Sequence, residues 1–102
     1  MNDSKFVSIA EQKLMEIADK IDEIDSQSVF ECEYSDGILT IESFNNDQTY
    51  VINKHSASQK IWFSSPLSGA DYFSYQIKEG KWLNAKNQEL SDKFFSEIKT
   101  LL

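Results

Sequence analysis

The sequence has no arginine, and it has only one cysteine, one histidine and one proline. A single cysteine, Cys32, excludes a disulfide within the chain, which fits a reducing compartment. A single histidine, His55, leaves no H-E-x-x-H motif and no His/Cys cluster for a closed metal centre. The three glycines are well separated, so no glycine-rich loop can cradle a phosphate. A G-x-S-x-G nucleophile motif is also absent.

Long apolar runs are missing as well. No stretch of about 18 apolar residues could cross a bilayer, so we expect no membrane contact. The first four residues, 1–4, are polar and acidic, unlike an apolar signal segment or an arginine-rich transit segment. We therefore expect either that the protein works where it is made or that a leader has been removed.

The chain has enough apolar sequence for a core. It is 102 residues long, 40% of them hydrophobic and 13% aromatic. This length suits one domain covering residues 1–102, with a core rich in aromatic rings. The apolar residues recur in patterned segments, which argues against disorder.

Negative charge is concentrated in the first half of the chain. The net charge is −7, and residues 1–47 hold 12 of the 17 acidic side chains but only 3 of the 10 lysines. Such a chain would repel nucleic acid, whose binding depends on neutralising phosphates, so we expect no nucleic-acid partner. It would instead be attracted to basic surfaces or to cations.

The first segment has a helical period. Between Asp3 and Asp25, apolar residues recur every three or four positions from Phe6 to Ile24, which predicts an amphipathic helix. Asp3 or Ser4 can cap its start. Most of the acidic residues of this segment lie on the side opposite the apolar stripe.

The period then changes to two. Alternating apolar and polar residues predict strands near residues 30–34, 39–42, 50–53, 60–64, 72–77 and 81–83. Turn signals separate them at 35–37, at Asn45-Asn46-Asp47, around Pro66 and at 79–80. The last segment regains helical spacing, with Asn87 or Ser91 as its cap.

This order of elements predicts the fold class. Short connections favour antiparallel pairing of neighbouring strands. Two amphipathic helices need one apolar sheet face to cover. We therefore expect an α+β two-layer sandwich, with both helices on one face of an antiparallel sheet of five or six strands.

Carboxylates form the first candidate site. The helix carries six of them and the first strand two, which would form one ridge if that strand is the sheet edge beside the helix; the residues are Glu11, Glu16, Asp19, Asp22, Glu23, Asp25, Glu31 and Glu33. Carboxylate oxygens suit hard cations, so weak and shallow metal sites are reasonable. The same pattern is also typical of a merely solvated helix face.

Trp62 is the second candidate site. Strand alternation places it on the outward sheet face with Lys60 and Ser64, across from Val51 and Asn53. An exposed tryptophan is a plausible anchor for a partner, although a covering loop would remove that role.

Other chemically active side chains have plainer interpretations. Alternation places Cys32 inward as an inert core residue. We interpret His55 as a surface residue in the loop after the third strand, and Trp82 as part of the core.

Several segments together resemble the frataxin family of iron–sulfur cluster biogenesis over nearly the whole chain. They are the acidic helix end, the Glu31-Cys32-Glu33 strand, the 36–41 hairpin return, the 50–54 and 59–69 strand motifs, and Lys81-Trp82. The 50–69 motifs are the part most specific to this family, whereas an acidic helix alone is not specific to it.

The resemblance implies a non-enzymatic accessory protein that docks on a cysteine desulfurase and a cluster scaffold and weakly binds iron as Fe²⁺ or Fe³⁺. Carried over by motif, the metal ridge is Glu11, Asp19, Asp22, Glu23, Asp25, Glu31 and Glu33; Glu16 is added from helix geometry alone. Asp19, Asp22 and Glu23 would also meet the desulfurase. The sheet contact would be Asn53, Lys54 and Trp62. The implied state is a monomer, with iron-induced oligomers as an alternative, in a bacterial cytoplasm or, after loss of a leader, in the mitochondrial matrix.

Two other functions stay open. An iron storage or ferroxidase protein would show iron oxidation with turnover. An acidic decoy that masks a basic protein would bind through net charge alone and would be indifferent to Trp62.

Overall fold

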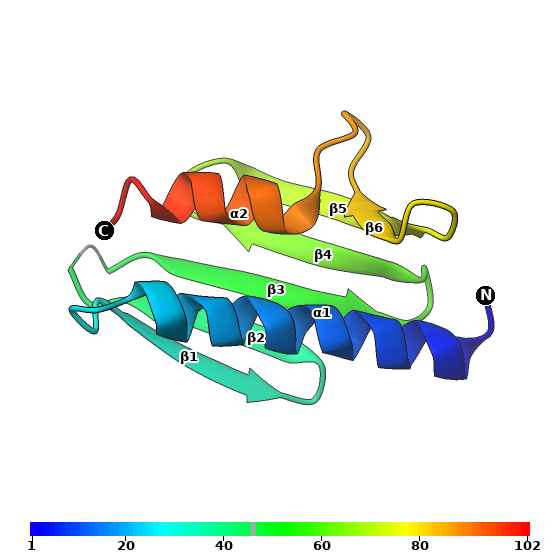
Figure 1. Ribbon diagram of the computed structural model, residues 1–102, viewed down its shortest axis with the longest axis horizontal. Coiled ribbons are helices and arrows are strands. Elements are labelled where there is room, and N and C mark those ends of the chain that lie inside the picture. The colour runs from blue at the N-terminus through cyan, green and yellow to red at the C-terminus, as the bar shows by residue number, and fades with distance from the viewer. Residues whose placement is uncertain (46) are drawn as a thin grey trace.

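The computed structural model describes residues 1–45 and 47–102. Two helices flank six strands in chain order (Figure 1). The elements are α1 (Asp3–Ile24), β1 (Phe30–Ser35), β2 (Ile38–Ser43), β3 (Thr49–His55), β4 (Lys60–Ser65), β5 (Gly69–Gln76), β6 (Lys81–Leu83) and α2 (Leu90–Ile98). The periodicity of the sequence predicts all eight elements, although β5 begins three residues earlier than expected. The turn expected at 45–47 includes Asn46, which lies outside the described residues.

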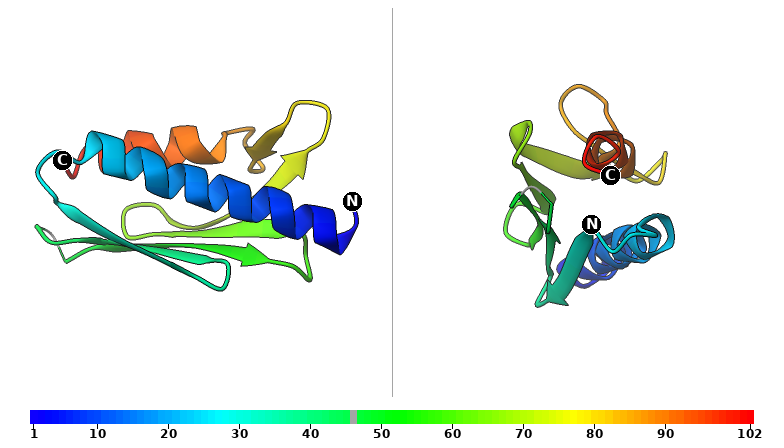
Figure 2. Two further views of the ribbon diagram at one scale, coloured as in Figure 1. Left: turned by 60° about the horizontal axis from the view of Figure 1, so that its bottom comes forward. Right: turned by 90° about the vertical axis from the view of Figure 1, so that its left-hand side faces the viewer.

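The sheet is an antiparallel meander with both helices on one face. Its strand order is β1-β2-β3-β4-β5-β6, so β1 and β6 are the edges. Figure 2 shows α1 and α2 on the same side of the sheet, with the other face uncovered by any helix. The predicted α+β two-layer sandwich is confirmed. Within the described residues, neither helix offers a stretch apolar and long enough to cross a membrane.

The strand register determines which side chains face the helices. Asp36 and Gly37 form a two-residue turn with positive φ at both positions, so Ser35 lies opposite Ile38 and the pairing continues to Phe30 opposite Ser43. A Cβ at Gly37 would lie 2.5 Å from Lys54 Cε, so the flexible Lys54 side chain would have to move, while the φ of 77° itself favours glycine.

The two helices bury the residues that the helical spacing selects. On α1 the buried side chains are Phe6, Ala10, Leu14, Ile17 and Ile21, and on α2 they are Leu90, Phe94, Phe95 and Ile98. They pack on the inward residues of the strands to form one core. Complete burial of a large apolar side chain contributes about 1.5–3 kcal/mol relative to exposure. Trp82 is 2% exposed and belongs to this core, as expected.

Both predicted helix caps are wrong by one or two residues. Asn2, not Asp3 or Ser4, caps α1, because its Oδ1 accepts a hydrogen bond from Lys5 N at 2.8 Å. Glu89 caps α2 by accepting from Asp92 N. Glu89 also pairs with Lys13 of α1 at 2.9 Å, a tie between helices that local sequence patterns cannot show.

Cys32 corrects the predicted core list. Its side chain points to the helix face, as alternation requires, but Cys32 is exposed. The reason is its position on the edge strand β1, which has only one neighbouring strand. Partial burial of the thiol, with the negative charges of Asp22 and Asp25, raises the pKa of Cys32 to about 11. The thiol therefore stays protonated near neutral pH and is a poor nucleophile.

Candidate functional site

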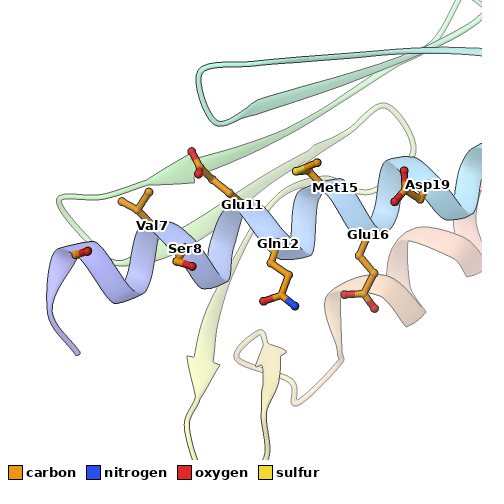
Figure 3. Close-up of a pocket in the computed structure, with 8 residues that line it drawn as sticks. Val7, Ser8, Glu11, Gln12, Met15, Glu16 and Asp19 are labelled. Carbon is orange, nitrogen blue, oxygen red and sulfur yellow. The ribbon is translucent and has the colours of Figure 1, made fainter.

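One flank of α1 carries the first group of predicted site residues. Glu11, Met15 and Asp19 recur every four positions and line the same shallow hollow along the helix (Figure 3). Met15 is 54% exposed, so this flank carries an apolar side chain between two carboxylates. Asp22, one turn further, is close enough to the Cys32 thiol to raise its pKa. The flank therefore leads directly to the edge strand β1.

The carboxylates of β1 lie on the other side of the same edge. Glu31 and Glu33 alternate with Cys32, so they face away from the helices while Asp22 lies on the helix side. Both glutamates are exposed. The predicted ridge thus wraps around the edge of the sheet, with carboxylates on both of its faces.

Glu42 also belongs to this group of carboxylates, although it was not among the ridge residues predicted from the sequence. It lies directly opposite Glu31 on β2, and both side chains are exposed. Counting back from the Asp36-Gly37 turn gives this pairing, so the sequence contained the signal. Like charges directly opposite each other destabilise a sheet. We call the exposed carboxylates of this region the acidic band: Asp19, Asp22, Glu23, Glu31, Glu33 and Glu42.

Three predicted ridge residues border the acidic band but differ from it in their contacts. Glu11 pairs with Lys54 Nζ at 3.3 Å, which partly neutralises it. Asp25 accepts backbone hydrogen bonds from Val29 N and Phe30 N, each at 2.8 Å, and so holds the entry into β1. Glu16 lines the same hollow as Glu11 and Asp19, but its side chain points away from those of Glu11 and Met15 (Figure 3). It also lines a second hollow, with Tyr75 of the β5–β6 hairpin.

No closed metal centre forms in the described part of the chain. Across residues 1–45 and 47–102, no three His, Cys, Asp or Glu side chains come together in a geometry that could hold an ion. The acidic band can therefore attract cations through its summed charge and bind them with one or two carboxylates at a time.

The outer sheet face is the second site, and it is centred on Trp62. The indole is 37% exposed and lies in register between Asn53 of β3 and Tyr72 of β5. Tyr72 meets it edge to face, with ring centroids 5.5 Å apart. No helix covers this face (Figure 2). The alternative in which a loop covers Trp62 is wrong.

A small hollow lies beside the indole. It has a volume of about 170 Å³ and is lined mainly by apolar atoms of Val51, Trp62, Phe63, Ala70 and Tyr72, with Asn53, Ser64 and Asp71 supplying polar groups. This is room for one side chain of a partner. Aromatic anchors beside such hollows are typical of interaction hot spots.

Lys54 and His55 differ from their predicted positions. Lys54 pairs with the inward residue Ile61, so it lies on the helix face and does not share the outer face with Trp62. The expectation that it belongs to the same sheet contact is wrong. His55 is the last residue of β3 rather than a loop residue, and its ring stacks on Trp62 with centroids 3.9 Å apart and planes at 14°. The outward alternation of β3 was the available signal for His55.

Comparisons with known proteins agree with this geometry. The family model described as a frataxin-like domain matches residues 1–102. Mitochondrial frataxin of Dictyostelium discoideum is 47% identical over 73 residues, which cover 71% of this chain and 37% of that protein. The aligned part thus spans little more than a third of that relative's length.

Solved structures show the same fold. Frataxin from Psychromonas ingrahamii superposes with a TM-score of 0.80 at 26% identity, covering 98% of this chain and 91% of that one. A trimeric frataxin of Saccharomyces cerevisiae, complexed with ferrous iron, gives a TM-score of 0.76 at 30% identity, covering 90% of this chain and 83% of that one.

Proposed function

Since this chain belongs to the frataxin-like family, we propose that it is a non-enzymatic accessory protein of iron–sulfur cluster assembly. In this role it docks on a cysteine desulfurase and a cluster scaffold, regulates sulfur transfer, and binds iron weakly. The observation that carries the proposal is the presence of two separate open surfaces: the acidic band at the β1 edge and the helix-free face around Trp62.

The acidic band supports the electrostatic part of the proposal. Its carboxylates are exposed and most of the lysines lie in the second half of the chain. Such a field steers basic partner surfaces and cations toward the β1 edge and speeds association. Fe²⁺ is a cation that carboxylate oxygens can ligate, and a related yeast frataxin has been solved with ferrous iron.

The Trp62 face supports the docking part. An exposed indole, a neighbouring Tyr72 and a hollow of about 170 Å³ provide an aromatic anchor and a recess on one rigid sheet. Truncating a hot-spot residue of this kind costs about 2 kcal/mol or more in binding, equivalent to roughly thirtyfold in affinity.

Weak surface binding is favoured over iron storage or a ferroxidase centre. The described residues, which exclude only position 46, bring no set of three metal-ligating side chains together. We propose that the protein acts as a monomer, in a bacterial cytoplasm or a mitochondrial matrix; the Dictyostelium relative is a mitochondrial frataxin.

The test is a sulfide-release and cluster-assembly assay with a cysteine desulfurase, its scaffold and Fe²⁺. We expect the wild-type chain to change the rate and Trp62→Ala to lose that effect, while its Fe²⁺ binding and circular dichroism stay unchanged. The matched control is Ile77→Ala, because Ile77 lies at an exposed turn. Tyr75→Ala would be unsuitable, because Tyr75 packs on the core. An unchanged rate with the wild-type chain in every condition would refute the proposal, and iron oxidation with turnover would favour the ferroxidase alternative.

A further inference from the structure

The stacked pair of His55 and Trp62 is the best-defined contact on the outer sheet face. The two rings are nearly parallel at 14°, and their centroids are 3.9 Å apart. One face of the indole is therefore covered by imidazole, while Tyr72 contacts it edge to face. These two neighbours restrict the orientation of the indole beside the hollow that it lines.

The imidazole is itself held in place. Its Nδ1 lies 2.8 Å from Ser58 Oγ in the turn between β3 and β4. A hydroxyl can donate to a neutral ring nitrogen or accept from a protonated one, so this contact is available in both charge states of the ring. Gln59 of the same turn donates to Met1 O and to the Asp3 carboxylate, which ties the turn to the start of α1.

Protonation would strengthen the stack. A cation over the face of an indole is attracted by the ring quadrupole, and tryptophan is the best partner for this interaction. Histidine is the side chain whose ordinary charge change falls within physiological pH. His55 is the only histidine of the chain, so a response in this range would have one side-chain source.

Charged groups from several elements surround this corner. Lys60 of β4 lies directly opposite His55 in register, so its ammonium would repel a protonated imidazole. The Met1 carbonyl and the Asp3 carboxylate, at the start of α1, lie at the β3–β4 turn, as the contacts of Gln59 show. Asp36 precedes Gly37, whose carbonyl accepts from Lys54 N beside His55. Tyr72 faces the indole from β5.

We propose that His55 is a positioning residue for docking through Trp62. It fixes the orientation of the indole, and it does so more firmly when the imidazole is protonated. The inference rests on the proposed function, because it concerns the same sheet face. Docking to the desulfurase–scaffold complex should then be tighter at pH 6 than at pH 8, by up to about fivefold, the upper limit set by an exposed cation–π contact.

The stack can be tested without a partner by tryptophan emission of the full chain. A protonated imidazole in contact with an indole quenches its emission, so the wild-type signal should fall from pH 8 to 5. Trp62→Phe isolates the buried Trp82 and supplies the background. The fall should be absent in His55→Gln and His55→Phe. An equal fall in His55→Gln, or no fall in the wild type, would overturn the inference.

Docking then separates this inference from the proposed function. With His55→Phe, which keeps a ring but no charge, affinity should be retained and its dependence on pH reduced relative to wild type; His55→Gln should lose both. If Trp62→Ala abolishes docking but the two His55 variants keep the wild-type affinity and pH dependence, only the inference fails. If Trp62→Ala docks normally, the proposed function fails and the inference with it.

Discussion

At the residue scale, Glu97 connects three parts of the fold through one carboxylate. Its Oε1 accepts from Tyr50 Oη at 2.9 Å and from Ser65 Oγ, and its Oε2 accepts from Ser68 Oγ at 2.7 Å. These bonds tie α2 to β3, to the end of β4 and to the loop after it. Burial, together with the hydrogen bond to Glu97, raises the pKa of Tyr50 well above its usual value.

Replacing Glu97 should therefore destabilise the protein more than its partial exposure suggests. Glu97→Ala leaves the buried hydroxyls of Tyr50 and Ser65 without their acceptor, at a cost of about 1–3 kcal/mol in the free energy of unfolding. Urea unfolding would measure this loss. Glu79→Ala, at the exposed β5–β6 turn, is the matched control and should change stability little. Equal effects of the two substitutions would contradict the role assigned to this carboxylate.

Single residues are also where sequence reasoning reached its limit. Alternation correctly assigned faces to Trp62 and Cys32, but it could not show that an edge strand leaves Cys32 exposed. It likewise could not show that the Asp25 carboxylate accepts hydrogen bonds from the backbone of Val29 and Phe30. Such outcomes depend on neighbours that are distant in sequence or on local loop geometry. The period of a pattern indicates only the face to which each side chain points.

At the scale of elements, the β1–β2 hairpin contains an unfavourable pairing of charges. Glu31 and Glu42 lie directly opposite each other at the sheet edge, and Glu33 lies opposite the neutral Thr40. A repulsive pair of this kind is tolerated on an exposed surface, but it reduces stability. A cation bound between the two carboxylates would relieve the repulsion.

Two matched substitutions test this point. Glu31→Gln removes the repulsion and should increase the free energy of unfolding by about 0.2–1 kcal/mol, while Glu33→Gln should not. Both should weaken Fe²⁺ binding, because each removes one charge of the acidic band. Thermal unfolding with and without Fe²⁺ would measure both effects. A gain in stability with Glu33→Gln as large as with Glu31→Gln would show that net charge, not the pairing, is responsible.

The elements themselves were largely readable from the sequence. The change of period from helical to alternating marks the end of α1 and the start of the sheet, and the Asp36-Gly37 turn fixes the hairpin register. The helix caps were harder to predict, because residues next to Asn2 and Glu89 are equally suitable caps. The ion pair of Glu89 with Lys13 could not be predicted from local sequence, because it involves another helix.

At the scale of the whole molecule, charge and packing act in opposite directions as the pH falls. Protonation of carboxylates makes the net charge of −7 less negative and so relieves self-repulsion. Burial alone would raise the pKa of Asp71 and Glu89, but hydrogen bonds and ion pairs with Lys93 and Lys13 outweigh it and lower the pKa of both carboxyls. Their stabilising contribution is therefore present above the unfolded pKa and is lost as pH falls through the folded pKa.

We accordingly expect stability to decline in acid below about pH 4, the ordinary range of carboxyl titration. Asp71→Asn or Glu89→Gln should lower stability at pH 7 and flatten the acid decline. Urea midpoints between pH 7 and 2 would show this, with Glu79→Gln as the exposed control. An acid decline as steep in both variants as in the wild type would assign the effect to other carboxylates.

The two open surfaces are the central claim at this scale. Helical and strand periodicity together predicted both of them, because Asp19 and Asp22 lie off the buried stripe of α1 while Glu31, Glu33 and Trp62 face outward on their strands. Their separation depends on the sheet: the acidic band lies at the β1 edge, and Trp62 lies on β4, three strands away in the sheet order.

The most direct test of the account is to follow the amide and indole signals of the labelled full chain by NMR during two titrations. With Fe²⁺, signals around Asp22, Glu31 and Glu42 should broaden while the Trp62 indole signal persists. With the desulfurase–scaffold complex, the Trp62 indole signal should shift or vanish. Loss of the indole signal with Fe²⁺ alone, or its indifference to the complex, would contradict the division of function between these two surfaces.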